Sequence, residues 1–154
     1  MDSDPEVHRY INNDPVSSIA QIRAVIKMLQ QQYKDNGIAR WAVVDKLSNE
    51  CLGWCGLKYF TETANGHSNF YEHGYRFKQK HWGKGYATEA SRAVLQYGFA
   101  HFGMETIYAL TDIDNVTSKN VLKKLKFEHE GSFDFDGRPA DWFVLHKEDW
   151  ENKS

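Results

Sequence analysis

The chain has 154 residues, a formal net charge of −2 with neutral histidines, and 41% hydrophobic residues. This length fits one domain with a core of its own, and the charge argues against a nucleic-acid-binding protein, which carries a strong basic excess. No apolar run approaches the length of a membrane span, and the polar start at Met1 is unlike a signal peptide. We therefore expect a single domain over residues 1–154, cytoplasmic and without nucleic-acid or membrane partners.

The predicted elements favour an α+β domain. The first is a helix over 18–34, where Ser18 and Gln21 read as a capping box and Gly37 ends the helix. Runs rich in aromatic and β-branched residues then predict strands over 41–44, 51–60 and 70–78. The remaining predicted elements are a helix over 85–102, a strand over 106–111, a helix over 116–126 capped by Asp114 or Asn115, and a closing hairpin of 127–135 with 142–147.

Cysteine and histidine spacing predicts no disulfide framework and no metal site. Cys51 and Cys55 lie in one predicted strand, about 13 Å apart by strand rise, which is too far for a bridge. The seven histidines form no His-x-x-x-His pattern. We expect reduced cysteines and no bound metal.

The segment from Gly74 to Ala90 carries the strongest functional signal. An extended run passes Gly83 and Gly85 and continues into a helix. Such a corner directs several backbone N–H groups and a helix N-terminus to one point, an arrangement that binds pyrophosphate. Thr88 stands where a dinucleotide fingerprint needs glycine, and Gly85 stands where a P-loop needs Ser or Thr, so neither fits. An ordinary strand-to-helix turn is the alternative.

This corner resembles the coenzyme A loop of the GNAT N-acetyltransferases, Gln/Arg-x-x-Gly-x-Gly/Ala. Here it reads Lys80-His-Trp-Gly-Lys-Gly85, with Lys80 in place of Gln or Arg. A second block, Asn115-Val-Thr-Ser118 followed by Val-Leu, Lys-Leu-x-Phe and Glu-Gly131, is also similar to the family pattern. Together they resemble the branch of bacterial ribosomal-protein N-terminal acetyltransferases, over about residues 3–150.

The resemblance implies a mixed, mostly antiparallel sheet flanked by helices. It also implies a first strand and a short helix before the Ser-Asp-Pro-Glu-Val segment at which this chain begins. We therefore expect a shortened N-terminus and an exposed strand edge, which proteins usually cover. A partner subunit in a homo-oligomer, or the chain's own N-terminal segment, is expected to cover it.

The resemblance further implies acetyl-CoA as the cosubstrate. The pantetheine is expected to lie in a splay between the strand that ends at Lys78 and the strand that ends near Thr111. It would hydrogen-bond to backbone groups there as an added strand does. The backbone groups expected to bind it belong to Arg76, Phe77 and Lys78. The amides expected to bind the pyrophosphate are those of Trp82, Gly83, Lys84, Gly85, Tyr86, Ala87 and Thr88. Asn115 and Ser118 complete the implied cofactor site.

Acetyl transfer to an amine requires a base that accepts the amine proton and a donor near the departing thiolate. Many relatives place a tyrosine acid where this chain has Leu122, so the resemblance suggests Ser118 as the substitute. A serine that bonds only to the helix backbone is the alternative. Glu72 and His73 are candidate bases on opposite faces of the entering strand, and the sequence leaves open which face meets the substrate.

Three functions are left open. The first is acetyl transfer from acetyl-CoA to a primary amine by direct attack, with a protein or peptide N-terminus as the favoured acceptor. The second has a small acceptor: a polyamine, an amino acid or an aminoglycoside. The third is a CoA-binding module without turnover, because Leu122 replaces the tyrosine and Lys126 replaces the usual glycine at the helix end.

Overall fold

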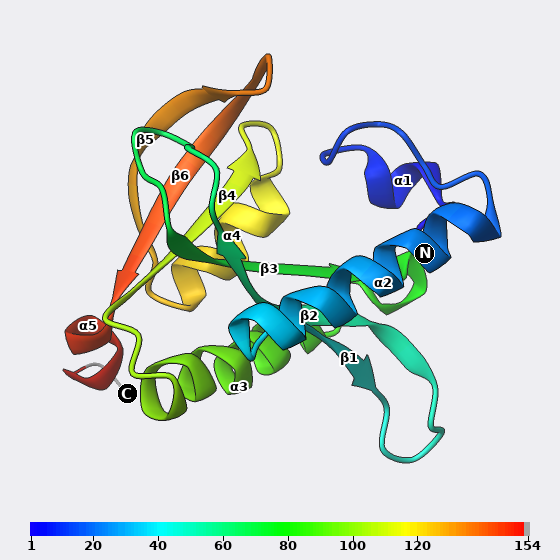
Figure 1. The fold of residues 1–154 in the computed structure, drawn as a ribbon, viewed down its shortest axis with the longest axis horizontal. Coiled ribbons are helices and arrows are strands. Elements are labelled where there is room, and N and C mark those ends of the chain that lie inside the picture. Colours follow the sequence, from blue (N-terminus) through cyan, green and yellow to red (C-terminus); the bar gives the residue numbers. More distant parts are fainter. Residues whose placement is uncertain (153–154) are drawn as a thin grey trace.

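A computed structural model describes residues 1–152 and contains a six-stranded sheet flanked by helices (Figure 1). The strands lie in the order β1-β2-β3-β4-β6-β5, and all neighbours are antiparallel except β3 and β4. The predicted mixed, mostly antiparallel sheet is confirmed. The strands are β1 (Arg40–Val44), β2 (Cys51–Phe60), β3 (Phe70–Phe77), β4 (Thr106–Asp112), β5 (Glu128–Phe135) and β6 (Arg138–His146).

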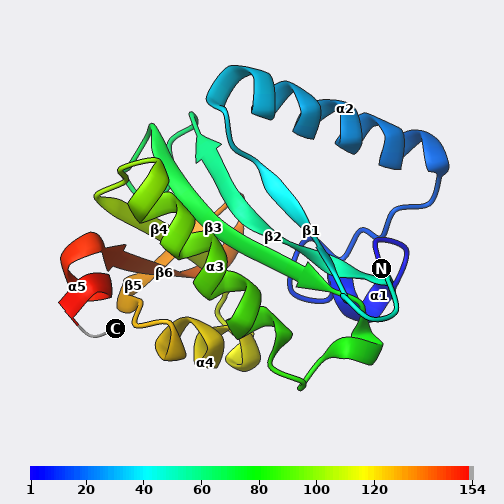
Figure 2. The ribbon, with the colours of Figure 1, turned by 90° about the horizontal axis from the view of Figure 1, so that it is seen from below.

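The helices cover the sheet on both faces. Figure 2 shows α3 and α4 on one face and α2 on the other. No helix within residues 1–152 combines the length and the apolar character that crossing a bilayer requires. The helices are α1 (Pro5–His8), α2 (Ile19–Asn36), α3 (Tyr86–His101), α4 (Val116–Lys124) and α5 (Lys147–Asn152), and η1 (Gln79–His81) is a short 3-10 turn.

Local signals set the ends of the long helices. The predicted capping box of Ser18 and Gln21 is present at the start of α2. At α4 the cap is Asn115, whose side chain accepts a hydrogen bond from the Ser118 backbone N–H at 3.0 Å. α4 ends two residues earlier than predicted, because Lys126 has a φ of 69°, a left-handed conformation that no helix interior allows.

Other predicted boundaries differ where periodicity is weak. The elements α1, η1 and α5 were not predicted, since helices this short show little hydrophobic pattern. β6 begins at Arg138 rather than at residue 142, directly after the two-residue turn. A hairpin with so short a turn keeps its strands paired up to the turn itself.

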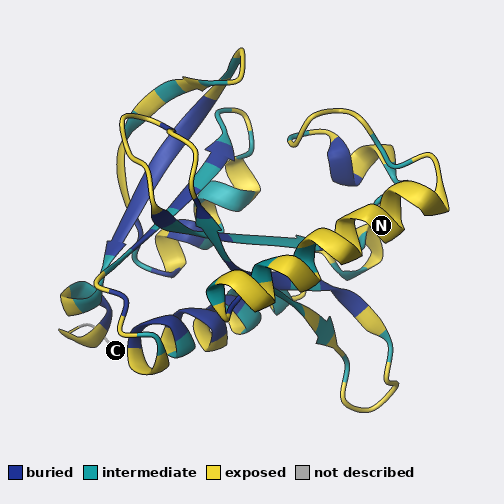
Figure 3. Ribbon diagram, in the orientation of Figure 1, coloured by how far each residue is buried: buried dark blue, intermediate teal, exposed yellow. Residues whose placement is uncertain are grey.

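The larger hydrophobic core lies between the sheet and the helices α3 and α4. α3 turns Ser91, Val94, Leu95, Gly98 and Phe99 inward. Gly98 is needed there, because a Cβ on it would lie 2.7 Å from Leu57 Cδ1. Figure 3 shows buried residues along β6 and along the inner side of α3. This packing holds the carboxyl ends of β3 and β4 in place.

The opposite face of the sheet is covered incompletely. α2 carries an apolar stripe, yet none of its residues is buried, and Ile19 is 72% exposed (Figure 3). Among the described strands β1 pairs with β2 alone, so its outer edge is unpaired. The expected exposed strand edge is thus present, and its cover by a second subunit stays a prediction.

Candidate active site

β3 and β4 open a splay at their carboxyl ends. The two strands are parallel and share one ladder pair, Glu72 with Tyr108, before they diverge (Figure 1). Each strand then leads into a helix, β3 through η1 into α3 and β4 directly into α4. The splay therefore lies where the sequence resemblance implied a pantetheine.

The corner between β3 and α3 has the geometry of an anion-binding loop. Gly83 and Gly85 have φ values of 73° and 85°, a left-handed conformation in which other residues are strained. A Cβ at either glycine would meet no atom within 4 Å, so the approach to the backbone is open. Gly85 provides no side-chain cap to α3, whereas Ser18 caps α2 and Asn115 caps α4. The first amides of α3 thus suit an external acceptor such as a pyrophosphate.

The other predicted loop residues surround these amides. The Trp82 side chain folds back, and its Nε1 donates to the Phe77 carbonyl oxygen at 2.9 Å. Lys84 is exposed at the tip of the corner, which leaves its ammonium available to an anion. The first turn of α3 is partly exposed at Tyr86, Ala87 and Thr88.

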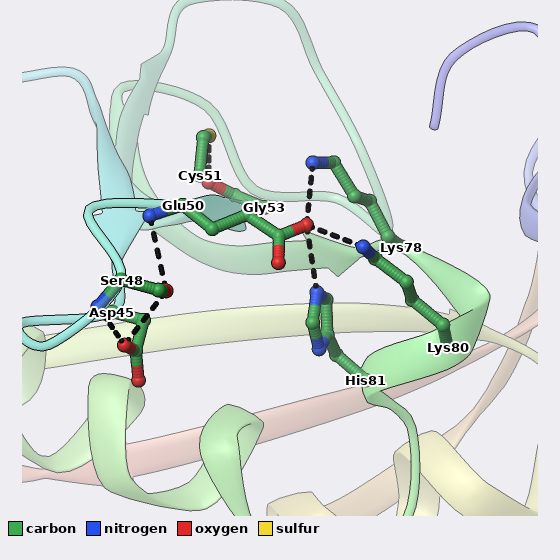
Figure 4. A network of polar contacts seen from close by, with 8 residues as sticks. All are labelled: Asp45, Ser48, Glu50, Cys51, Gly53, Lys78, Lys80 and His81. Carbon is green, nitrogen blue, oxygen red and sulfur yellow. Dashed lines mark hydrogen bonds and ion pairs between the residues drawn. The ribbon is translucent and has the colours of Figure 1, made fainter.

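A carboxylate gathers the basic side chains of the corner. Glu50 Oε1 lies 2.6 Å from Lys80 Nζ, 3.2 Å from Lys78 Nζ and 3.4 Å from His81 Nε2 (Figure 4). The hydrogen bonds from Lys80 and then Lys78 lower the pKa of Glu50 to about 2. The corner is therefore tied to the β1–β2 turn, and the charge of Lys80 is partly neutralised within the protein.

Successive residues of β3 direct their backbone N–H and C=O groups alternately toward β2 and toward the splay. The Lys78 N–H donates to the Leu52 carbonyl at 2.9 Å, so Lys78, and Arg76 two residues before it, direct their backbone groups toward β2. The backbone groups of Tyr75 and Phe77 point into the splay, where the Phe77 carbonyl already accepts a hydrogen bond from Trp82 Nε1 and the Phe77 N–H remains for a ligand. The pairing expected at Arg76, Phe77 and Lys78 thus shifts to Tyr75 and Phe77, because the sequence does not reveal which edge of a strand is already occupied.

Two hydroxyl groups meet where β3 and α4 approach each other. Tyr75 Oη lies 3.0 Å from Ser118 Oγ, and both residues line the same cavity. Ser118 is therefore more than a serine bonded to its own helix. Burial raises the pKa of Tyr75 to about 12, so this hydroxyl stays protonated and can donate. Sequence reasoning found Ser118 and missed Tyr75, although Tyr75 shares the strand face of His73 at a spacing of two.

The two candidate bases have different surroundings. His73 is 2% exposed on the core face, and its Nε2 lies 2.9 Å from Ser91 Oγ. Burial lowers the pKa of His73 to about 4. Both residues line the cavity, but Glu72 is partly exposed and lies on the open face, and burial raises its pKa. A carboxylate whose pKa is raised toward neutrality suits a general base, so Glu72 is the better placed of the two.

One cavity of about 490 Å³ joins these groups. Its walls include segments that no motif marked: the stretch after α1, the start of β1, the middle of β2 and the β5–β6 turn. The register of the sheet brings them together, which a local sequence signal cannot reveal. The lining residues that sequence reasoning missed include Tyr10, Asn12, Arg40, Trp54 and Arg138. No group of three or more His, Cys, Asp or Glu within residues 1–152 is arranged to hold a metal ion.

Comparisons with known proteins agree with this geometry. The model of the acetyltransferase (GNAT) domain matches residues 1–128. The "uncharacterized N-acetyltransferase p20" of Bacillus licheniformis is 33% identical over 129 residues, 84% of this chain and 70% of the relative. A GNAT-family acetyltransferase from Bacillus anthracis has a TM-score of 0.75 and 26% identity, covering 95% of this chain and 84% of that one. The ribosomal-protein-S5-alanine acetyltransferase of Vibrio fischeri shares the fold, with a TM-score of 0.72, 21% identity and coverage of 89% and 79%.

Proposed function

The chain belongs to the GNAT acetyltransferases, and we propose that it transfers the acetyl group of acetyl-CoA to a primary amine held in the cavity at the β3–β4 splay. The observation that carries this proposal is the arrangement of three side chains around one cavity. Glu72 lies on one side of β3, and the hydrogen-bonded hydroxyls of Tyr75 and Ser118 lie on the other. A base and a donor on opposite sides of the reacting centre suit an amine that attacks a thioester.

The residues of the corner fit the cosubstrate. Left-handed glycines and uncapped amides at the start of α3 suit a pyrophosphate, and the Tyr75 and Phe77 backbone suits the amides of a pantetheine. When bound there, acetyl-CoA supplies the acetyl thioester, whose sulfur leaves as a thiolate. The protein then has two tasks, to deprotonate the amine and to stabilise the departing charge.

Glu72 performs the first task in this proposal. A primary amine is mostly protonated at neutral pH and cannot attack in that form. The Glu72 carboxylate takes one proton from the ammonium nitrogen, directly or through a water, and leaves the nitrogen lone pair free. Because burial raises the pKa of Glu72, the carboxylate holds this proton better than an exposed glutamate does.

Tyr75 and Ser118 perform the second task by hydrogen bonding. With a pKa of about 12, the Tyr75 hydroxyl is a weaker acid than an ordinary thiol, whose pKa is about 8.5, so full proton transfer to a thiolate is unfavourable. A hydrogen bond toward the sulfur needs no such transfer. Ser118 orients the tyrosine hydroxyl from the first turn of α4.

The catalytic reading is preferred over a CoA-binding module without turnover. That alternative depended on Leu122 at the family's tyrosine position and on Lys126 at the family's glycine position, and Lys126 adopts the left-handed conformation that a glycine would take there. Leu122 is buried at 2% exposure beside the cavity, and the hydroxyl of Tyr75 reaches the same cavity from the neighbouring strand. A hydroxyl is thus supplied from a different element.

Two classes of amine acceptor are compatible with this proposal. The two motifs favour a protein or peptide N-terminus, as in the ribosomal-protein branch. A cavity walled by the segment after α1 and by the β5–β6 turn also suits a small amine. Both acceptors use the same base and the same donor pair.

The test combines cofactor binding with turnover. We expect acetyl-CoA to raise the unfolding temperature saturably, and Gly83→Glu with Gly85→Glu to abolish that rise by filling the loop with negative side chains. Thiol release is then followed with a panel of amines. Saturable binding without thiol release for any amine would support the non-catalytic module, and no binding by folded protein would remove the acetyl-CoA proposal.

A further inference from the structure

Two oppositely charged side chains share the open face of the sheet without an ion pair to another residue. Arg40 on β1 and Glu72 on β3 are partly buried, and both line the cavity. Within residues 1–152 neither has an ion pair or a side-chain hydrogen bond; Glu72 is influenced by the charges of Lys58 and Arg40, and Arg40 by those of Glu72, Arg76 and Asp2. Charges withdrawn from water are normally paired, because an unpaired one loses several kcal/mol of solvation. This pattern indicates that a ligand provides the missing partners.

The Trp54 ring fixes the position of Arg40 and extends over Gly74. The guanidinium carbon of Arg40 lies 4.1 Å from the centroid of the Trp54 ring, a cation–π contact. The register places Arg40 opposite Gly56 and Gly56 opposite Gly74, and a Cβ on Gly74 would lie 3.6 Å from the Trp54 ring, so this ring lies over Gly74. Gly74 is also where the splay begins. The Trp54 ring therefore connects Arg40 to the start of the splay at Gly74.

The nearest cations on this face already have other contacts. Arg76 Nη1 pairs with Asp2 Oδ1 at 2.9 Å. Lys58 lies opposite Glu72 in the register, but its Nζ lies 4.5 Å over the Phe60 ring and Lys58 is not among the residues that line the cavity. Arg138 belongs to a different wall, at the β5–β6 turn. Arg40 is thus the guanidinium that faces the acceptor space beside Glu72.

We propose that Arg40 binds a carboxylate of the acceptor, so that the substrate is a primary amine with a carboxylate close to it, an amino acid or an amino-acid-like compound. This inference rests on the proposed acetyl transfer and narrows its acceptor. The planar guanidinium takes the carboxylate through two parallel hydrogen bonds, while the ammonium lies at Glu72. A polyamine would place a second cation against Arg40, and a peptide N-terminus would place a neutral amide there.

The first experiment compares acceptors that differ only in the carboxylate. Each amino acid, its amide and its decarboxylated amine are incubated with the protein and saturating acetyl-CoA, beside spermidine and an alanine-initiated peptide. Thiol release is measured and products are verified by mass spectrometry. For the preferred side chain we expect kcat/KM of the acid to exceed that of the amide by about 10- to 100-fold. Equal values for acid and amide, or a preference for spermidine or the peptide, would overturn the proposal.

Variants of Arg40 then assign the effect to its guanidinium. Arg40→Gln should raise KM for the acid by about 10- to 100-fold and change the amide rate by less than about threefold. Arg40→Lys, which keeps the charge but loses the planar fork, should recover part of the preference. Arg23→Gln, at an exposed arginine of α2 outside the cavity, is the matched control. An Arg40→Gln protein that unfolds at the wild-type temperature and keeps the acid preference would contradict the assignment.

A binding measurement separates this inference from the proposed function. If no amine releases thiol, the acetyl-transfer proposal fails, and thermal-shift titrations of the CoA-saturated protein decide the carboxylate site. Stabilisation by amino acids but not by their amides, lost in Arg40→Gln, would support the site without turnover. No stabilisation by any amino acid would overturn it.

Discussion

The two faces of the sheet give ionisable side chains different surroundings, as the neighbouring residues Glu72 and His73 of β3 show. On the core face His73 is 2% exposed, bonded to Ser91 and covered by α3. On the open face Glu72 meets a cavity and has no bonded partner among residues 1–152. Burial lowers the pKa of the histidine and raises that of the carboxylate, so both favour the neutral form. Both residues line the cavity, and they differ in that the Glu72 side chain is partly exposed there while the His73 ring is buried against α3.

The largest expected effect is on the open face. Glu72→Gln should lower kcat by about 100-fold or more, because no carboxylate then accepts the amine proton. In the wild type kcat should fall as the pH drops through the pKa of Glu72, which burial holds above its ordinary value, since the protonated carboxyl cannot act as a base. The Gln variant should lack that limb of the pH profile. Thiol-release kinetics between pH 5 and 9 test this, and an unchanged kcat would return the role of base to another group.

The donor pair should matter less than the base. Tyr75→Phe removes one hydrogen bond to the departing sulfur and should lower kcat by about 10-fold, with KM for acetyl-CoA nearly unchanged. Ser118→Ala should lower kcat by a smaller factor, because the tyrosine hydroxyl remains. The two variants combined should act less than additively, as expected of residues that work as one unit. Purely additive losses would contradict a coupled pair.

A substitution on the core face should lower the stability of the protein and leave its turnover unchanged. Ser91→Ala removes the partner of His73 Nε2, so the buried ring would lose its hydrogen bond to α3. We expect a loss of about 1–3 kcal/mol in the free energy of unfolding. Denaturant titration measures the loss, and kcat below the unfolding transition should stay within about twofold. A large fall in kcat with normal stability would show that His73 takes part in the chemistry.

The smallest effect is expected at the end of α4, outside both faces. Lys126 has a φ of 69°, so Lys126→Gly should relieve backbone strain and stabilise the protein by about 1 kcal/mol. Lys124→Gly, in the last turn of the helix, is the matched control and should destabilise by a similar amount. Chemical denaturation of the two variants should therefore give shifts of opposite sign. A loss in both would mean that the Lys126 side chain contributes contacts that outweigh the strain.

Local sequence patterns determined most of the elements of this fold. The capping box at Ser18, the cap at Asn115 and the two glycines of the corner act within a few residues of themselves, so spacing alone located α2, α4 and the start of α3. The anion-binding corner could be predicted for the same reason, because its glycines act within a few residues of themselves. Elements without a periodic pattern, such as α1 and α5, could not be predicted in this way.

Tertiary structure alone decided which side chains share the cavity. Tyr75 and Ser118 are 43 residues apart in the chain and meet only because β3 lies beside β4 and α4 follows it. Arg40 lies in the row of Gly74 through two strand pairings whose register depends on which faces are buried. The sequence placed Glu72 and His73 on opposite faces but could not orient those faces, because strand order and helix cover arise from packing over the whole domain. Spacing thus identifies the coenzyme A corner, and sheet register assembles the acceptor pocket.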